Sequence, residues 1–160
     1  MNRVEIEQTR QYDELWGLLL MADPSKEIVS AYLNQSSVYV AKINGIIVGS
    51  YVLFRESSLE FEIKNIAVSP EYHKVGIGYQ MLIHAQSVYQ DVGGSKLKIC
   101  TGNTSTHQIA LYKKAGFCIE SIVTGFFVEN YIDPIYENGA RCEDLVVMFH
   151  EASVVVRLDH

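Results

Sequence analysis

The chain has 160 residues, of which 48% are hydrophobic and 20% charged, and its formal net charge is −6. This length and composition are typical of one globular domain with its own core and exclude a disordered chain. The acidic balance argues against a nucleic-acid partner, which would require a clustered basic face, and is compatible with a cationic partner.

No apolar run approaches the length of a membrane-spanning helix, and the polar start of the chain does not resemble a secretory signal. We therefore expect a cytoplasmic protein with no membrane partner, as a monomer or a homodimer. The three cysteines, Cys100, Cys118 and Cys142, are widely spaced and form no metal-binding pattern. Reduced thiols are expected, with neither a disulfide nor a bound metal.

The apolar pattern predicts one domain over residues 1–150 and a tail over 151–160. In chain order we expect a strand at 2–7, helices at 12–21 and after Pro24, strands at 37–43, 46–54 and 59–68, a helix at 78–90, a strand at 96–101, a helix at 105–115, and strands at 117–128 and 144–149. Asn44-Gly45 predicts a type I′ hairpin turn, and Gly116 predicts a left-handed helix cap. The order predicts a mixed α/β sheet with helices on both faces.

A glycine-rich turn is the most informative segment of the chain. Its residues are His73, Lys74, Val75, Gly76, Ile77 and Gly78. Two glycines let the backbone approach a ligand closely, and the helix that follows presents free N–H groups and its positive dipole end to a diphosphate. The turn lacks both the lysine of a Walker A loop and the first glycine of a dinucleotide fingerprint, so we expect a nucleotide-bearing cofactor other than ATP or NAD.

Two motifs in this order resemble the GCN5-related N-acetyltransferase (GNAT) family. The family's pyrophosphate turn reads Gln/Arg-x-x-Gly-x-Gly/Ala, and residues 110–117, Ala-Leu-Tyr-Lys-Lys-Ala-Gly-Phe, are similar to its second motif. The resemblance implies the GNAT acyl-CoA N-acyltransferase fold, a mixed, mostly antiparallel sheet flanked by helices on both faces. It also implies acetyl-CoA as cosubstrate and a primary amine as acceptor.

The resemblance assigns a cofactor role to two stretches of backbone. They are Ile66, Ala67 and Val68 for the pantetheine arm, and Val75, Gly76, Ile77 and Gly78 for the pyrophosphate. His73 stands where the family usually has Gln or Arg, and Lys74 either compensates for the lost charge or is simply solvated. Relatives often carry Asn where this chain has Ser105, so Asn103 is the expected side-chain contact to pantetheine.

Tyr112 and Glu62 are the expected catalytic residues. Tyr112 matches the family tyrosine that protonates the departing thiolate, and a phenol in a shielded site can do so; the alternative is a packing role. An acceptor ammonium must lose a proton before it attacks, and Glu62 matches the position of a glutamate base in the histone-acetylating branch. The alternative for Glu62 is a solvated charged face shared with Glu60 and Lys64.

The segment 138–148 resembles the C-terminal strand of the ribosomal-protein alanine acetyltransferases, and Tyr131 and Tyr136 precede it. This resemblance slightly favours a protein or peptide amine over a small-molecule amine as acceptor. The fold and motifs do not specify the acceptor, because acceptor loops vary independently of the cofactor site. A second class of function also fits the sequence, a non-catalytic acyl-CoA-binding module that keeps the phosphate turn without turnover.

Overall fold

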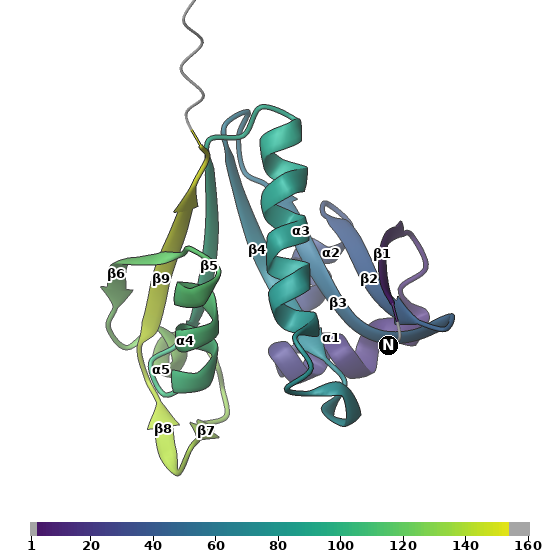
Figure 1. Cartoon of the computed structure of the whole chain (residues 1–160). Helices are drawn as coiled ribbons and strands as arrows, with labels where there is room; N and C mark the ends of the chain where they lie inside the picture. Colours follow the sequence, from purple (N-terminus) through teal and green to yellow (C-terminus); the bar gives the residue numbers. More distant parts are fainter. Residues whose placement is uncertain (1–2, 154–160) are drawn as a thin grey trace, which may run out of the picture.

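The computed structural model of the chain describes residues 3–153. A seven-stranded sheet in the order β1-β2-β3-β4-β5-β9-β6 forms its centre (Figure 1). Its strands are β1 (Val4–Thr9), β2 (Ser37–Ile43), β3 (Ile46–Arg55), β4 (Glu60–Val68), β5 (Lys96–Gly102), β6 (Cys118–Val123) and β9 (Leu145–Glu151). All neighbouring strands pair antiparallel except β4 and β5, which run parallel. A separate two-stranded hairpin, β7 (Ile135–Glu137) and β8 (Ala140–Cys142), follows β6 in the chain.

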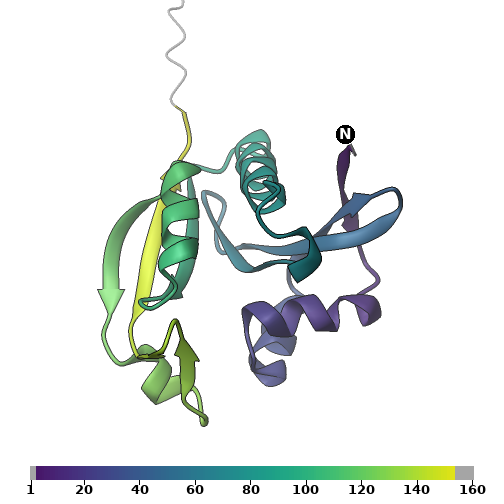
Figure 2. The same ribbon diagram turned by 60° about the horizontal axis from the view of Figure 1, so that its bottom comes forward.

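Helices cover both faces of the sheet (Figure 2). They are α1 (Trp16–Ala22), α2 (Lys26–Leu33), α3 (Ile77–Asp91), α4 (Thr106–Lys114) and α5 (Phe126–Asn130), with 3-10 turns η1 (Asp13–Leu15) and η2 (Pro70–Tyr72). Successive side chains of a strand point to opposite faces, so β2 serves two cores. Val38 and Val40 pack with Leu19 and Val29 of α1 and α2, whereas Ala41 belongs to the core under α3 and α4.

The predicted fold class is confirmed, and every expected strand and helix is present in the expected order. Asn44 and Gly45 both have positive φ, 51° and 78°, as a type I′ turn requires. Gly116 is left-handed, with φ 97°. Residue 2 of the first predicted strand and residues 154–160 of the predicted tail lie outside the described residues.

The predicted strand over 117–128 is wrong beyond Val123. Gly125 adopts φ 73°, and its N–H donates a hydrogen bond to Asp144 Oδ1 at 3.0 Å. A left-handed residue ends strand geometry, so the chain turns there and forms the short helix α5. Two smaller differences are that the helix expected at 12–21 begins as η1, and that the expected loop around Asn138-Gly139 contains the β7–β8 hairpin.

The parallel strands β4 and β5 stop pairing about halfway along their length. Their pairing runs from Glu60 and Lys96 to Ile63 and Ile99 and then stops. At the same place Lys64 is an extra residue in β4, because Val52 of β3 pairs with Asn65 and the next residue of β3 pairs with Ile63. A β-bulge bends its strand, and Figure 1 shows the sheet opening into two halves below this point.

No helix within the described residues is long and apolar enough to span a membrane.

Leu82 of α3 offers a test of the core that holds the phosphate turn in place. Its side chain is fully buried, whereas the neighbouring Ile83 is 38% exposed. We expect Leu82→Ala to lower the free energy of unfolding by about 2–5 kcal/mol, because it leaves a cavity under the helix. Ile83→Ala, the control on the same helix, should cost less than about 1 kcal/mol in the same urea titration. Equal losses from both variants would contradict the packing described here.

Candidate active site between the two halves of the sheet

The turn between β4 and α3 has the backbone shape of an anion cradle. Lys74 and Gly76 both adopt left-handed φ angles, 66° and 85°. Helix α3 has no side-chain cap, so the N–H groups of its first turn remain available to a ligand. A Cβ at Gly76 would meet no atom within 4 Å, and the turn is exposed to solvent. These features fit a diphosphate group.

His73 and Lys74 lie in this turn with different roles. The His73 ring nitrogen Nε2 lies 2.8 Å from the carbonyl oxygen of Val68, and since a carbonyl can only accept, Nε2 carries the proton. The imidazole thus ties the turn to the end of β4. The Lys74 side chain is exposed.

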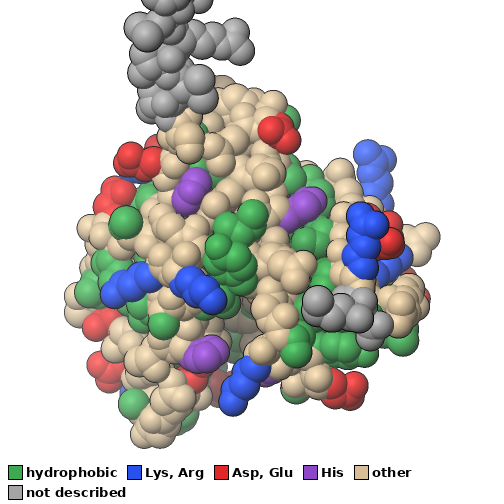
Figure 3. Space-filling model, in the orientation of Figure 1, with side chains coloured by type: hydrophobic (Ala, Val, Ile, Leu, Met, Phe, Trp, Pro, Cys, Tyr) green, Lys and Arg blue, Asp and Glu red, His purple; other side chains and the backbone are tan. Residues whose placement is uncertain are grey.

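A cavity of about 520 Å³ occupies the space where β4 and β5 diverge. Its lining includes Glu62, Ile66 and Tyr112, which were predicted from the sequence. It also includes Tyr131, at the end of α5, and Tyr136 of β7. On the face shown in Figure 3, hydrophobic side chains gather between α3 and α4, above a hollow between the two halves of the molecule. The parting of the strands therefore brings two predicted catalytic residues, distant in sequence, to one cavity.

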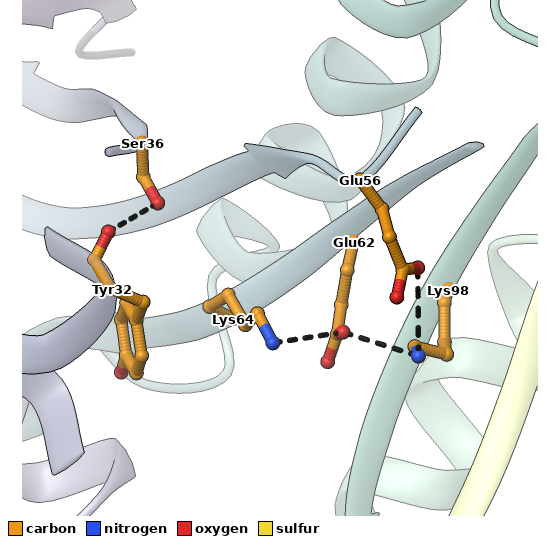
Figure 4. A network of polar contacts seen from close by, with 6 residues as sticks. All are labelled: Tyr32, Ser36, Glu56, Glu62, Lys64 and Lys98. Atoms are coloured by element: carbon orange, nitrogen blue, oxygen red, sulfur yellow. Dashed lines mark hydrogen bonds and ion pairs between the residues drawn. The ribbon is translucent and has the colours of Figure 1, made fainter. Parts of the chain in front are cut away.

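Glu62 is 8% exposed and lies between two lysines. Its Oε1 accepts from Lys64 Nζ at 3.1 Å and from Lys98 Nζ at 3.3 Å, and Lys98 Nζ also lies 3.8 Å from Glu56 (Figure 4). Burial lowers the pKa of Lys98, but the carboxylates of Glu62 and Glu56 raise it, and the net shift is upward. Both ion pairs of Glu62 use Oε1, which leaves Oε2 for a ligand or water.

Tyr112 projects from α4 and is 5% exposed. Burial raises the pKa of its phenol, and the nearby carboxylate of Glu137 raises it further. The Ser105 hydroxyl, at the start of α4, donates a hydrogen bond to Glu137 of β7. The phenol of Tyr112 therefore stays protonated at neutral pH.

A polar wall closes the side of the cavity formed by α1, α2 and β4. Asn65 is 3% exposed, and its Nδ2 donates to the Leu19 carbonyl at 2.9 Å and to the Tyr32 hydroxyl at 3.1 Å. Asp23 Oδ1 accepts from the Tyr131 hydroxyl at 3.0 Å. This last bond joins the α1–α2 junction to the loop after α5, so it links the two halves of the molecule across the cavity.

Asn103 does not line the cavity. Its Oδ1 accepts from the backbone N–H groups of Glu143 and Asp144 at 3.3 and 3.2 Å, so it braces the start of β9. Sequence analysis missed Asp23, Asn65 and Glu137. Asn65 could have been noticed as a polar residue within the apolar strand around Ile66. No sequence feature pointed to Glu137, because its strand has only three residues.

Residues 2–117 match the model of the Acetyltransferase (GNAT) family. The chain belongs to the GNAT family. It is therefore an enzyme of the acetyltransferase class, and the predicted family is confirmed. It is 41% identical over 148 residues to a curated relative from Bacillus subtilis (strain 168), described as the uncharacterized N-acetyltransferase YvbK, covering 92% of this chain and 94% of the relative.

Two solved GNAT structures are similar to this one. A GNAT family acetyltransferase from Elizabethkingia anophelis, with acetyl-CoA bound, is 42% identical with a TM-score of 0.89, covering 92% of this chain and 97% of that one. The ribosomal-protein-S18-alanine N-acetyltransferase from Escherichia coli is 20% identical with a TM-score of 0.76, covering 100% and 99%. At that identity the second likeness shows the shared fold alone.

The phosphate turn leads to a prediction about acetyl-CoA. We expect saturating acetyl-CoA to raise the melting temperature, because a ligand at 100 times its dissociation constant stabilises the native state by about 2.7 kcal/mol. Gly76→Asp should abolish the shift, since it places a carboxylate where the phosphates would lie.

Gly93→Asp is the matched control for this experiment. Gly93 has the same φ of 85° and equally open surroundings, but it lies at the other end of α3. It carries the same backbone strain and the same added charge, and its acetyl-CoA shift should equal that of the unsubstituted protein. A wild-type melting temperature that does not respond to acetyl-CoA would refute the cofactor assignment.

Proposed function

We propose that this GNAT enzyme transfers the acetyl group of acetyl-CoA to a primary amine by direct attack in a ternary complex. The observation that carries the proposal is that a carboxylate, Glu62, and a protonated phenol, Tyr112, line the same cavity at the point where β4 and β5 part. Direct aminolysis of a thioester needs two such groups, one to remove a proton from the amine and one to supply a proton to the sulfur.

The proposed cofactor site runs from the phosphate turn into the strand gap. The amides of residues 75–78 would hold the pyrophosphate, and the backbone of Ile66, Ala67 and Val68 would hold the pantetheine arm. Two observations support this placement. Beyond Ile63, the edge of β4 that faces β5 has no strand partner within the described residues, and the helix that follows has no side-chain cap. Asn103 is less well placed for this role, because its side chain braces β9 instead.

Glu62 and Tyr112 would divide the proton transfers. Glu62 Oε2 accepts a proton from the acceptor ammonium, directly or through a water molecule, and frees the nitrogen lone pair. The nitrogen attacks the thioester carbon, the new C–N bond forms, and the C–S bond breaks as the tetrahedral adduct collapses. Tyr112 supplies the proton that the departing thiolate takes up, and the second amine proton leaves to solvent. The proton held by Glu62 then passes through solvent to the Tyr112 phenolate, which restores both groups.

Cys100 lines the same cavity, and its state supports direct transfer. Burial raises the pKa of the Cys100 thiol to about 12, and Glu62 contributes to the rise. A neutral thiol is a poor nucleophile, which disfavours an acetyl-cysteine intermediate. The same argument favours a packing role for the Cys100 side chain.

A hydrogen bond that crosses the cavity supports a small amine as the acceptor. The hydrogen bond between Asp23 and Tyr131 crosses from one half of the molecule to the other, and an extended peptide would have to pass around it. The slight preference for a peptide amine, drawn from the C-terminal resemblance, stays an untested prediction. A non-catalytic module is disfavoured, since both proposed catalytic groups are present in one cavity.

The role of Glu62 can be tested by Glu62→Gln. We expect turnover to fall by about a hundredfold or more, because a neutral amide cannot accept the proton, while acetyl-CoA affinity stays nearly unchanged. Glu60→Gln, on the same strand and exposed, is the control and should retain activity. Thiol release from acetyl-CoA in the presence of an amine panel measures both. Full activity of Glu62→Gln would make Glu62 a structural charge only.

Tyr112→Phe tests the proton donor while preserving the ring that packs in the site. Turnover should fall about ten- to a thousandfold with little change in apparent acetyl-CoA affinity, the pattern of an interaction made mainly in the transition state. Tyr39→Phe, which alters a tyrosine outside the cavity, is the matched control. Loss of cofactor binding in proportion to rate would instead identify Tyr112 as a packing residue.

A further inference from the structure

Asn65 has a buried hydrogen-bond acceptor that no residue between 3 and 153 uses. Its amide nitrogen faces the Leu19 carbonyl, which can only accept, so the orientation of the amide follows from the bond. Its Oδ1 is buried and has no partner among the described residues. A buried oxygen without a hydrogen-bond donor is unfavourable, and this one lies in the wall of the cavity. A hydrogen-bond donor on a ligand that reached this oxygen would remove that cost.

Asp23 and Tyr32 line the cavity with Asn65. Asp23 receives the Tyr131 hydroxyl and the Ser25 N–H, both on Oδ1, which leaves Oδ2 free. Burial raises the pKa of Tyr32 to about 12, and the carboxylates of Asp23 and Glu62 add to the rise. Glu62 lines the same cavity, so this wall and the Glu62 carboxylate border one space.

The Glu62 end and the Asp23 end of the cavity differ in the charges that surround each carboxylate. Glu62 is flanked by two ammonium groups, whereas Asp23 forms no ion pair within residues 3–153. A neutralised environment around Glu62 suits the reacting amine, which must lose its proton. An uncompensated carboxylate at Asp23 has the opposite effect, because it stabilises an ammonium group in its charged form. Asp23 therefore suits a cation that binds without reacting.

We propose that the acceptor is a small amine with a second, non-reacting ammonium group, which donates hydrogen bonds to Asn65 Oδ1 and to the carboxylate of Asp23. This inference rests on the proposed function, since it assigns the substrate class of the same cavity. Asn65 and Asp23 are specificity-determining residues in this assignment. The reacting amine lies at the Glu62 end, and the second ammonium lies at the Asn65 end.

The test compares three primary amines with four carbon atoms each, whose distal ends carry an ammonium group, no polar group or a carboxylate. They are 1,4-diaminobutane, n-butylamine and 4-aminobutyrate, assayed with acetyl-CoA by thiol release and supplemented by diamines of three, five and six carbons. We expect kcat/KM for the best diamine to exceed that of its monoamine by about 10- to 100-fold, the scale of one or two hydrogen bonds to charged groups. The amino acid should be the poorest, because its carboxylate faces Asp23.

Asp23→Asn removes the charge and keeps an oxygen for Tyr131 and Ser25. The ratio of diamine to monoamine kcat/KM should fall about tenfold or more in this variant. Asp91→Asn, an identical change on the exposed end of α3, is the control and should leave the ratio unaltered. Asn65→Ala should lower the same ratio; if it does not fold, the Asp23→Asn comparison alone decides.

Equal kcat/KM values for the three matched acceptors would overturn the further inference and leave the proposed function intact. The further inference would also be overturned if Asp23→Asn did not change the ratio of diamine to monoamine kcat/KM. A short peptide with a free N-terminus that had a higher kcat/KM than every diamine would overturn it too. If the protein bound acetyl-CoA but released no thiol with any amine, the proposed function itself would be wrong, and the inference with it.

Discussion

The active site depends on one constraint in the sheet, the end of the parallel pairing between β4 and β5. Four residue pairs join these strands, and the bulge at Lys64 then bends β4 away. Before the bulge, the pairing secures the two halves of the sheet to each other. After it, the edge of β4 that faced β5 has no neighbouring strand. The backbone N–H and C=O groups on that edge therefore cannot form hydrogen bonds within the sheet. The same departure from regular structure creates the cavity and the gap in which we place the pantetheine arm.

Charge is distributed unevenly around this gap, and the distribution matches its proposed chemistry. Lys64 and Lys98 offset Glu62 where an amine would lose a proton, while Asp23 forms no ion pair within residues 3–153 where a cation would be held. Tyr112 is deeply buried on the other side, where burial keeps its proton in place. The net acidity of the chain is thus consistent with a cationic substrate, although position rather than total charge determines what each carboxylate does.

Local features of the site could be predicted from the sequence because their causes are local. The Asn44-Gly45 turn, the strand periodicity and the glycine turn before α3 depend on φ preferences and hydrogen bonds within a few residues. The strand predicted through Gly125 is wrong there for a non-local reason. Gly125 has a positive φ and donates a hydrogen bond to Asp144, nineteen residues later, and these end the strand. The hydrogen bonds of Asn103 could not be predicted for the same reason, since its partners lie about forty residues later in the chain.

By itself the sequence determined the family, the order of strands and helices, the phosphate turn and the identity of Tyr112 and Glu62 as candidates. Only the tertiary structure decided that these two side chains share a cavity, that Glu62 is paired with two lysines, and that Asn65 offers an unused oxygen there. The physical reason is that motifs and turns are short-range in sequence. Ion pairs, burial and cavities arise where segments distant in sequence meet, and here they meet where two strands separate.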